Sequence, residues 1–278
     1  MRVNSINNSY YRQNSPNFKN WDRTVYKPTF IANAADEVLH RNTTNFFRPS
    51  LTYWKDLVSF VNNRFKNVPK VNVYDYGCSD GSEIYSFIVT ALSILNDKYA
   101  NKFFPIIAKD YDPVAIEKCL SRNICISDNE MAALMKLLKD YSGKNNYFND
   151  CFKFLSEGKN GVMKKQNGYV CFVRDSEFIV QEPLFNKAKF SVADIREDYV
   201  NIEPENSIVF ARNFWPYLSE EDRRNMAHNL YKQLKGNSIL VLGNFDGCCE
   251  YNGTNMFEVL QDNGFKKSEI RNIFVKEL

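Results

Sequence analysis

Acidic side chains flank a short segment that begins and ends with glycine. Gly77 and Gly81 stand four residues apart, with Asp75 just before them and Glu83 just after. Glycines let a ligand approach the backbone closely. The spacing G-x-x-x-G is neither a phosphate-binding P-loop nor the G-x-G-x-x-G pattern of dinucleotide enzymes. Because carboxylates repel a pyrophosphate, the segment predicts a site for a cationic ligand, with a plain tight turn as the alternative.

A third carboxylate, Asp110, ends the apolar run FPIIAKD at 104–110. A carboxylate at the tip of a second strand can accept hydrogen bonds from both ribose hydroxyls of an adenosine. The alternative role for Asp110 is to cap the helix that follows. Together with the carboxylates near residue 80, it suits a positively charged nucleoside without phosphates. S-adenosylmethionine (SAM) fits that description.

Strands and helices alternate on both sides of these residues. Apolar residues recur at helical spacing over 51–65 and 84–95, and the β-rich run 71–76 lies between them. Further strands are predicted at 104–110, 189–194, 207–211 and 238–243, with one or two more in 265–276. Further helices are predicted to begin at Pro113, to cover 131–138, to run from 219 to about 235, and to end at Gly264. The alternation predicts an α/β fold with a doubly wound, mostly parallel sheet. In such sheets ligands bind at the carboxyl ends of the strands.

One segment interrupts the alternation of strands and helices, and two short motifs mark where helices begin. Residues 141–182 contain short apolar runs separated by Gly- and Lys-containing turns, which predicts a small antiparallel insertion. SDNE at 127–130 and SEED at 219–222 have the composition and spacing of helix N-terminal caps.

Composition excludes several classes of protein. Of 278 residues, 44% are apolar and 25% charged, as in ordinary globular proteins. No apolar run approaches the roughly 18 residues of a transmembrane helix, and the N-terminus lacks a secretory signal, so a cytoplasmic protein without membrane insertion is expected. Seven Cys without CxxC spacing and only two His, at positions 40 and 228, predict neither a disulfide framework nor a metal site.

Charge is uneven along the chain. Residues 1–70 carry 11 Lys and Arg against 4 Asp and Glu, whereas the rest carries 25 against 29. A basic head of this kind suits an anionic partner, such as a nucleic acid or an acidic protein face. A solvated polar segment is the alternative.

Four motifs in the same order resemble those of the CheR-type chemoreceptor methyltransferases. They are NTTNFFR at 42–48, GCSDGSEIYS at 77–86, AKDYD at 108–112 and ARNFWPYLS at 211–219. The resemblance covers residues 42–243 and implies the seven-stranded class I methyltransferase fold. It departs from the family in the short region before Asn42, in Ser82, and in Gly243-Asn244-Phe245-Asp246, where the family commonly has Gly-His-Ser-Glu.

The resemblance implies which residues form the site. The implied SAM contacts are Asn42, Thr44, Arg48, Gly77, Glu83, Asp110, Asp194, Ile195, Arg212 and Asn213. Asp194 and Ile195 would lie against the adenine, and Tyr217 would lie near the methyl group. Arg48 and Tyr217 would act in catalysis by steering the acceptor. Glu83 can pair the methionine ammonium, while an Arg can pair its carboxylate.

The function implied is SAM-dependent O-methylation of a protein glutamate, without a metal and with S-adenosylhomocysteine as product. An acidic, receptor-like protein is the implied partner, nucleic acid is not expected to bind, and a monomer is expected. Residues 1–68 would pack over the cofactor site and residues 69–278 would form the methyltransferase domain. A methyltransferase for small molecules or nucleic acid, and a SAM-binding module without activity, remain open. A nucleic-acid methyltransferase remains an alternative because Asn213-Phe-Trp-Pro-Tyr217 partly matches a motif of such enzymes.

Overall fold

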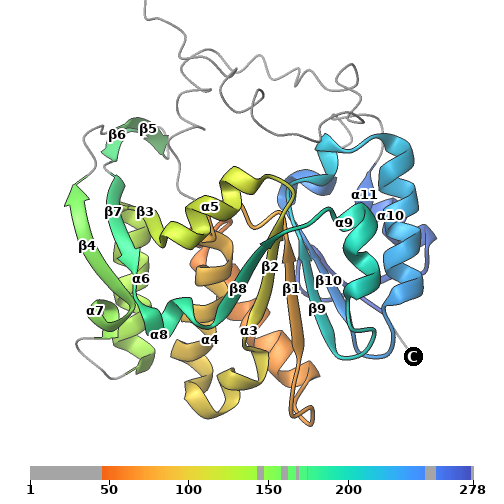
Figure 1. Ribbon diagram of the computed structural model, residues 1–278. Coiled ribbons are helices and arrows are strands. Elements are labelled where there is room, and N and C mark those ends of the chain that lie inside the picture. The colour runs from red at the N-terminus through yellow and green to blue at the C-terminus, as the bar shows by residue number, and fades with distance from the viewer. Residues whose placement is uncertain are drawn as a thin grey trace, which may run out of the picture.

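A seven-stranded sheet forms the centre of the computed structural model, which describes residues 46–142, 147–157, 162–166, 169–173, 175–247 and 255–276 (Figure 1). The strands are β1 (Asn72–Tyr76), β2 (Ile106–Asp110), β8 (Ala188–Val192), β9 (Ser207–Ala211), β10 (Ile239–Leu242), β11 (Lys266–Lys267) and β12 (Ile273–Val275). Their order is β11-β12-β10-β9-β1-β2-β8. All neighbours pair in parallel except β12, which is antiparallel to both β10 and β11. The predicted doubly wound α/β fold is therefore confirmed.

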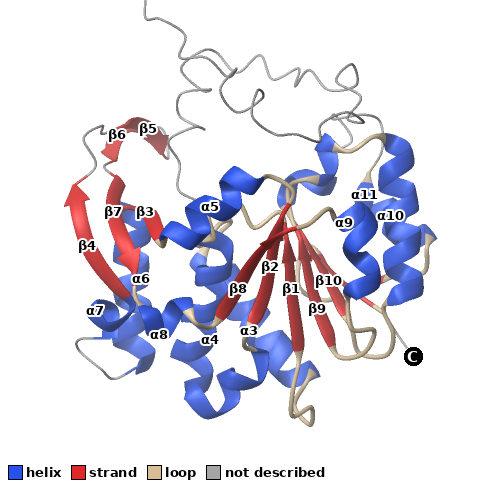
Figure 2. Cartoon of the chain, viewed as in Figure 1, coloured by secondary structure: helices blue, strands red, loops and turns tan. Residues whose placement is uncertain are grey.

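Helices cover both faces of this sheet (Figure 2). They are α3 (Leu51–Arg64), α4 (Ser82–Ala100), α5 (Pro113–Ser121), α6 (Asp128–Ser142), α7 (Tyr147–Cys151), α8 (Glu182–Phe185), α9 (Ile195–Asp198), α10 (Glu220–Gln233) and α11 (Met256–Asp262). Short 3-10 turns are η2 (Asn101–Phe103), η3 (Tyr199–Asn201), η4 (Trp215–Tyr217) and η5 (Asn244–Gly247). Alternate side chains of β1 face opposite layers. Val73 belongs to the apolar cluster with α3 and α4, whereas Tyr74 belongs to the cluster with α10 and α11. Strands buried on both faces in this way read as continuous apolar runs.

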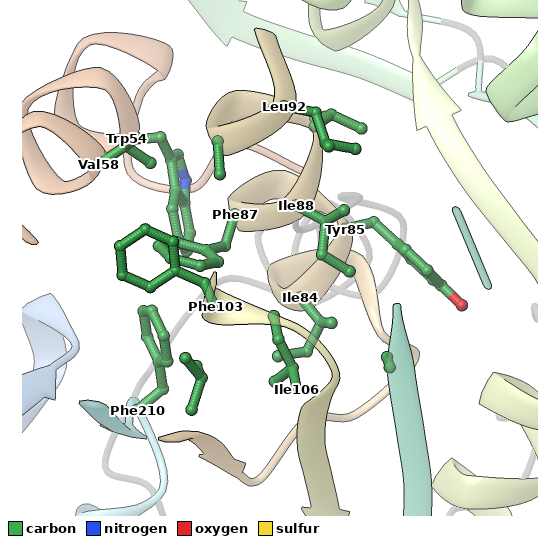
Figure 3. Packing of buried hydrophobic residues seen from close by; sticks show 14 of the residues in the cluster. Trp54, Val58, Ile84, Tyr85, Phe87, Ile88, Leu92, Phe103, Ile106 and Phe210 are labelled. Atoms are coloured by element: carbon green, nitrogen blue, oxygen red, sulfur yellow. The ribbon is translucent and has the colours of Figure 1, made fainter. Parts of the chain in front are cut away.

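Aromatic rings fill the layer between α3, α4 and the sheet (Figure 3). The Phe87 ring of α4 lies 5.4 Å from that of Phe210 on β9 and 5.9 Å from that of Phe103, measured between centroids. Trp54 of α3 packs on the same cluster, 6.5 Å from Phe87. All four side chains are buried. The contacts fix α3 against the sheet, so the apolar face predicted at 51–65 has its partner.

Two small antiparallel sheets lie beside the main one, and only the three-stranded one is next to α6 and α7 (Figure 1). One has the order β3-β7-β4 and the other pairs β5 with β6. Their bounds are β3 (Asn123–Ser127), β4 (Phe152–Glu157), β5 (Val162–Gln166), β6 (Tyr169–Val173) and β7 (Asp175–Val180). The sequence indicated strands only within 141–182, so β3 was missed. Its run NICIS is short and gains its regular structure by pairing with β7, which lies about fifty residues later.

The helix-capping predictions are confirmed. Pro113 occupies the first turn of α5, and the Ser219 side chain caps α10 by accepting from the Asp222 N–H at 3.1 Å. At the start of α6, Glu130 reaches back and accepts from the Ser127 N–H at 2.9 Å. None of the described helices is both long and apolar enough to cross a membrane.

The order of the strands determines where a ligand can bind. From β1 the chain moves to β2 and β8 on one side, and it later returns to place β9 and β10 on the other. Sheets of this kind hold ligands at such a reversal, beyond the carboxyl ends of the strands. The turns after β1 and β9 therefore lie at the site, and the turns after β2 and β8 lie beside it.

Phe87→Ala is expected to lower the free energy of unfolding by about 3–5 kcal/mol, because it empties the centre of the aromatic cluster. Chemical denaturation followed by circular dichroism measures the change. Leu120→Ala is the matched control, since Leu120 is 53% exposed and should change stability by less than about 0.5 kcal/mol. Equal losses in the two variants would contradict the assignment of this core.

Candidate functional site

The carboxyl ends of four neighbouring strands bring the described candidate residues to one edge of the sheet. Gly77 follows β1, Asp110 ends β2, Asp194 lies two residues after β8, and Arg212 follows β9. These strands are adjacent in the order β9-β1-β2-β8. Candidates that are spread over positions 77 to 212 of the sequence therefore lie at one edge of the sheet. The candidates Asn42 and Thr44 lie outside the described residues.

The loop after β1 turns sharply through left-handed backbone. Gly77, Ser79 and Gly81 have φ angles of 80°, 53° and 83°. The positive φ at Gly77 favours glycine, and a Cβ atom there would also lie tightly against Phe214, 3.1 Å from a ring carbon. The turn directs the Ser79 N–H at Asp110, which accepts at 2.8 Å through Oδ2. This hydrogen bond holds the loop after β1 against the end of β2.

Asp110 is partly buried at the tip of β2. Its Oδ1 accepts from the Asp112 N–H at 2.9 Å, in addition to the bond from Ser79. Burial raises the pKa of Asp110, while the two backbone donors oppose the rise. A carboxylate has about four acceptor positions. The remaining ones are available to hydroxyl donors such as those of a ribose.

Glu83, in the first turn of α4, forms an ion pair with Arg212. Oε2 of Glu83 lies 2.5 Å from Nη1 of Arg212, whose side chain is 3% exposed. Nη2 of Arg212 donates to the backbone carbonyl of Arg48 at 3.0 Å. The guanidinium carbon lies 5.3 Å from the centre of the Trp54 ring. Arg212 therefore joins the end of β9 to α4, to α3 and to the segment that precedes α3.

Two acceptor atoms beside this pair are buried without a donor. Oε1 of Glu83 and Oδ2 of Asp75 have no hydrogen-bond partner among the described residues. Burial raises the pKa of Glu83, an effect that Arg212 and Arg48 partly offset. Burial also raises the pKa of Asp75 well above its usual range, and Glu83 adds to the rise. Unpaired buried acceptors are costly, so this corner of the site calls for a ligand that brings positive charge and N–H donors.

Asp194 already has a partner that the sequence analysis did not foresee. Its Oδ1 accepts from the backbone N–H of Arg196 at 2.9 Å, and the Arg196 side chain donates to both of its oxygens at 2.9–3.0 Å. The Arg196 guanidinium carbon also lies 5.9 Å from the centre of the Tyr111 ring. The neighbouring side chain of Ile195 is buried. Arg196 therefore stands with Asp194 where the resemblance implies an adenine.

Asp246 fixes the turn after β9 from the neighbouring strand. Asn213 is left-handed, with φ of 61°, and its N–H donates to Oδ2 of Asp246 at 2.8 Å. The same oxygen accepts from the Gly243 N–H at 2.6 Å. Burial raises the pKa of Asp246 to about 7. The sequence analysis recorded residues 243–246 only as a departure from the family. Nothing in the spacing indicated that Asp246 bonds to the backbone of Asn213.

Arg48 and Tyr217 present a cation and a phenol near the same site. The Arg48 guanidinium carbon lies 5.1 Å from the centre of the Phe245 ring. Burial lowers the pKa of Arg48, and so does Arg212, while Glu83 and Tyr217 oppose the change. Tyr217 is 55% exposed. One charged donor and one hydroxyl can therefore meet a ligand that approaches from solvent.

The donor and acceptor set fits the amino-acid end of a SAM molecule. An ammonium group would satisfy the unpaired oxygens of Glu83 and Asp75, and ribose hydroxyls would satisfy Asp110. Within the described ranges, His, Cys, Asp and Glu nowhere gather in threes with the geometry of a metal site.

Strand order, with an antiparallel β12 beside β10, together with this site defines a class I SAM-dependent methyltransferase fold. Within that class, part of the chain is similar to the CheR methyltransferases. The profile of the "CheR methyltransferase, SAM binding domain" matches residues 42–163. SAM is accordingly the cofactor of this domain.

Relatives of known sequence and structure are distant. A chemotaxis protein methyltransferase of Borreliella burgdorferi is 22% identical over 214 residues, which cover 73% of this chain and 63% of that protein. The chain thus spans less than two thirds of that relative's length.

Among solved structures, an N-methyltransferase of Bradyrhizobium japonicum is 10% identical, with 82% of this chain and 98% of that chain covered and a TM-score of 0.38. A magnesium protoporphyrin IX methyltransferase of Synechocystis with bound SAM is 13% identical, with 91% and 86% covered and a TM-score of 0.38. At these scores the fold assignment rests on the strand order.

The free energy of unfolding is expected to fall as pH rises from about 4 to about 7, and Asp246→Asn should reduce this dependence. Native Asp246 keeps its proton up to about pH 7, whereas in the unfolded chain it loses the proton near 3.8. Between these values the native state binds more protons, so raising pH favours unfolding. Urea titrations at a series of pH values measure the slope.

The dependence should weaken without vanishing, because burial also raises the pKa values of Glu83 and Asp75, with the same sign. Asp56→Asn is the matched control, since Asp56 is exposed on α3. A slope in Asp246→Asn that equals those of the wild type and the control would contradict the role assigned to Asp246.

Proposed function

We propose that this chain transfers the methyl group of SAM to a carboxylate oxygen of a glutamate in an acidic, receptor-like protein. The buried Glu83–Arg212 pair carries the proposal, because its unpaired Oε1 offers an ammonium group a carboxylate shielded from water. The acceptor is inferred from the B. burgdorferi relative, which is named a chemotaxis protein methyltransferase.

A carboxylate acceptor needs orientation more than it needs a base, since it is ionised at neutral pH. When bound, SAM supplies a methyl carbon on a cationic sulfur, and the acceptor oxygen bonds to that carbon as the carbon–sulfur bond breaks and its electron pair stays on sulfur. The oxygen must be held in line, at roughly 3–3.5 Å. Arg48 can pair the acceptor carboxylate and Tyr217 can donate a hydrogen bond to it. No metal takes part in this proposal.

The proposed cofactor contacts divide by the part of SAM they meet. Glu83 and Asp75 take the ammonium, Asp110 takes the ribose hydroxyls, and Ile195 lies against the adenine. Arg212 and Asn213 hold Glu83 and the turn after β9 in place. Arg196 forms part of the adenine pocket, through its contacts with Asp194 and Tyr111. Asn42 and Thr44 are included on the resemblance alone.

Residues 1–68 are proposed to pack over the cofactor site, with 69–278 as the methyltransferase domain. Their described part supports this arrangement. The Phe47 N–H donates to the Ser86 hydroxyl of α4 at 2.8 Å, and the Arg48 carbonyl accepts from Arg212. Phe46 and Phe47 are 2% and 4% exposed. The bond to Arg212 keeps Arg48 next to the end of β9, which supports the proposed arrangement.

The protein incubated with radiolabelled SAM and an acidic receptor-like protein is expected to produce methyl esters, which release methanol when treated with base. Asp110→Asn should lower SAM affinity about 10- to 100-fold, because it weakens hydrogen bonds to an ionised acceptor. Calorimetry measures affinity and base-released radioactivity measures the ester.

Glu220→Gln serves as the control, since Glu220 is exposed on α10 and forms its ion pair with Arg224 of the same helix. It should leave both readouts unchanged. Label that resists base would instead indicate methylation of nitrogen. Incorporation into nucleic acid or a small molecule would overturn the protein acceptor. SAM binding without turnover in any extract would overturn the enzyme activity.

Deletion of residues 1–49 is expected to abolish SAM binding while leaving a folded sheet domain, because it removes Arg48 and both buried Phe side chains. Circular dichroism measures folding and calorimetry measures binding. Deletion of residues 1–41 is the matched control and should keep SAM binding. Normal binding after the longer deletion would show that the N-terminal segment is not part of the site.

A further inference from the structure

The hydroxyl of Tyr53 is a buried polar group that no described residue satisfies. Tyr53 lies in the first turn of α3 and is 9% exposed. Its hydroxyl has no hydrogen-bond partner. A buried hydroxyl left unpaired costs roughly 1–3 kcal/mol, so a fold tolerates it where a ligand later supplies the partner. The position of Tyr53 indicates which ligand that is.

Tyr53 packs against the central ion pair of the site. The Arg212 guanidinium carbon lies 5.7 Å from the centre of its ring. Burial raises the pKa of Tyr53 to about 12, an effect that Arg212 opposes and Glu83 enhances. The hydroxyl therefore keeps its proton at neutral pH and acts as a donor. It also lies within electrostatic reach of both members of the pair.

A donor and an acceptor near Arg212 are thus left unpaired. The acceptor is Oε1 of Glu83, and the donor is the Tyr53 hydroxyl; the two do not bond to each other. An α-amino acid carries a donor group, the ammonium, one carbon away from an acceptor group, the carboxylate. Such a zwitterion satisfies each atom with a group of the matching kind, because its ammonium donates and its carboxylate accepts.

We propose that the Tyr53 hydroxyl donates a hydrogen bond to the carboxylate of the amino-acid end of SAM, while Glu83 accepts from its ammonium. The assignment rests on the proposed function only in that SAM occupies this site. It makes α3 part of the cofactor pocket through a side chain that none of the four sequence motifs contains. Helix α3 then contacts the amino-acid end of the ligand directly through Tyr53.

The test compares SAM with decarboxylated SAM, which keeps the adenosine, the sulfonium and the amine but lacks the carboxylate. Tyr53→Phe should weaken SAM binding about 10- to 100-fold, as expected for a hydrogen bond to a charged group. Binding of decarboxylated SAM should stay unchanged. The melting temperature of the unliganded protein should stay equal or rise, because the variant removes an unpaired polar atom.

Tyr85→Phe is the matched control. Tyr85 on α4 (Figure 3) is also buried with a hydroxyl that has no partner among the described residues. Its ring, however, lies 6.2 Å from that of Phe190 on β8, measured between centroids. It should leave SAM affinity unchanged. Equal weakening of both ligands by Tyr53→Phe, or of SAM by both variants, would overturn the proposal in favour of a packing role. Unchanged SAM affinity in Tyr53→Phe would overturn it outright. A wild type that binds neither ligand would instead contradict the proposed function.

Discussion

A buried ion pair, Glu83 with Arg212, is the interaction on which the site depends. Two charges taken out of water are costly unless their other hydrogen-bonding atoms are also satisfied. Arg212 meets Glu83 and the Arg48 carbonyl, but its Nε and Oε1 of Glu83 have no partner among the described residues. The protein thus holds a desolvated corner that the proposed cationic ligand would complete. Binding energy for the ligand and stability of the unliganded fold are opposed at this point.

Backbone geometry at the strand ends keeps that corner open. Gly77 and Asn213 are both left-handed, and Asp246 holds the second turn by accepting two backbone N–H bonds. A Cβ atom at Gly243 would lie 2.0 Å from Oδ1 of Asn213, so the turns after β9 and β10 interlock. Because the turns are fixed before a ligand arrives, little ordering remains to be done on binding.

The segment before the sheet completes the site from a distance. Helix α3 is held by Trp54 against the aromatic cluster, and this anchor positions Arg48 and Tyr53 beside Arg212. Arg48 and Arg212 are 164 residues apart in sequence. An exposed Tyr217 and a cation at the same edge suit recognition of an anionic acceptor. In the proposed arrangement, the turns at the sheet edge hold the cofactor and α3 shapes its entrance.

The sequence by itself determined the alternating fold and the residues at the strand ends, because hydrophobic period, glycine turns and helix caps are local signals. It therefore placed Gly77, Asp110 and Arg212 on one edge. Only the tertiary structure decided their partners: Arg196 on Asp194, Asp246 on Asn213, and the Tyr53 hydroxyl beside Arg212. Strand β3 likewise formed only through pairing with distant β7. Such contacts depend on how elements pack, and no spacing along the chain records which side chains then meet.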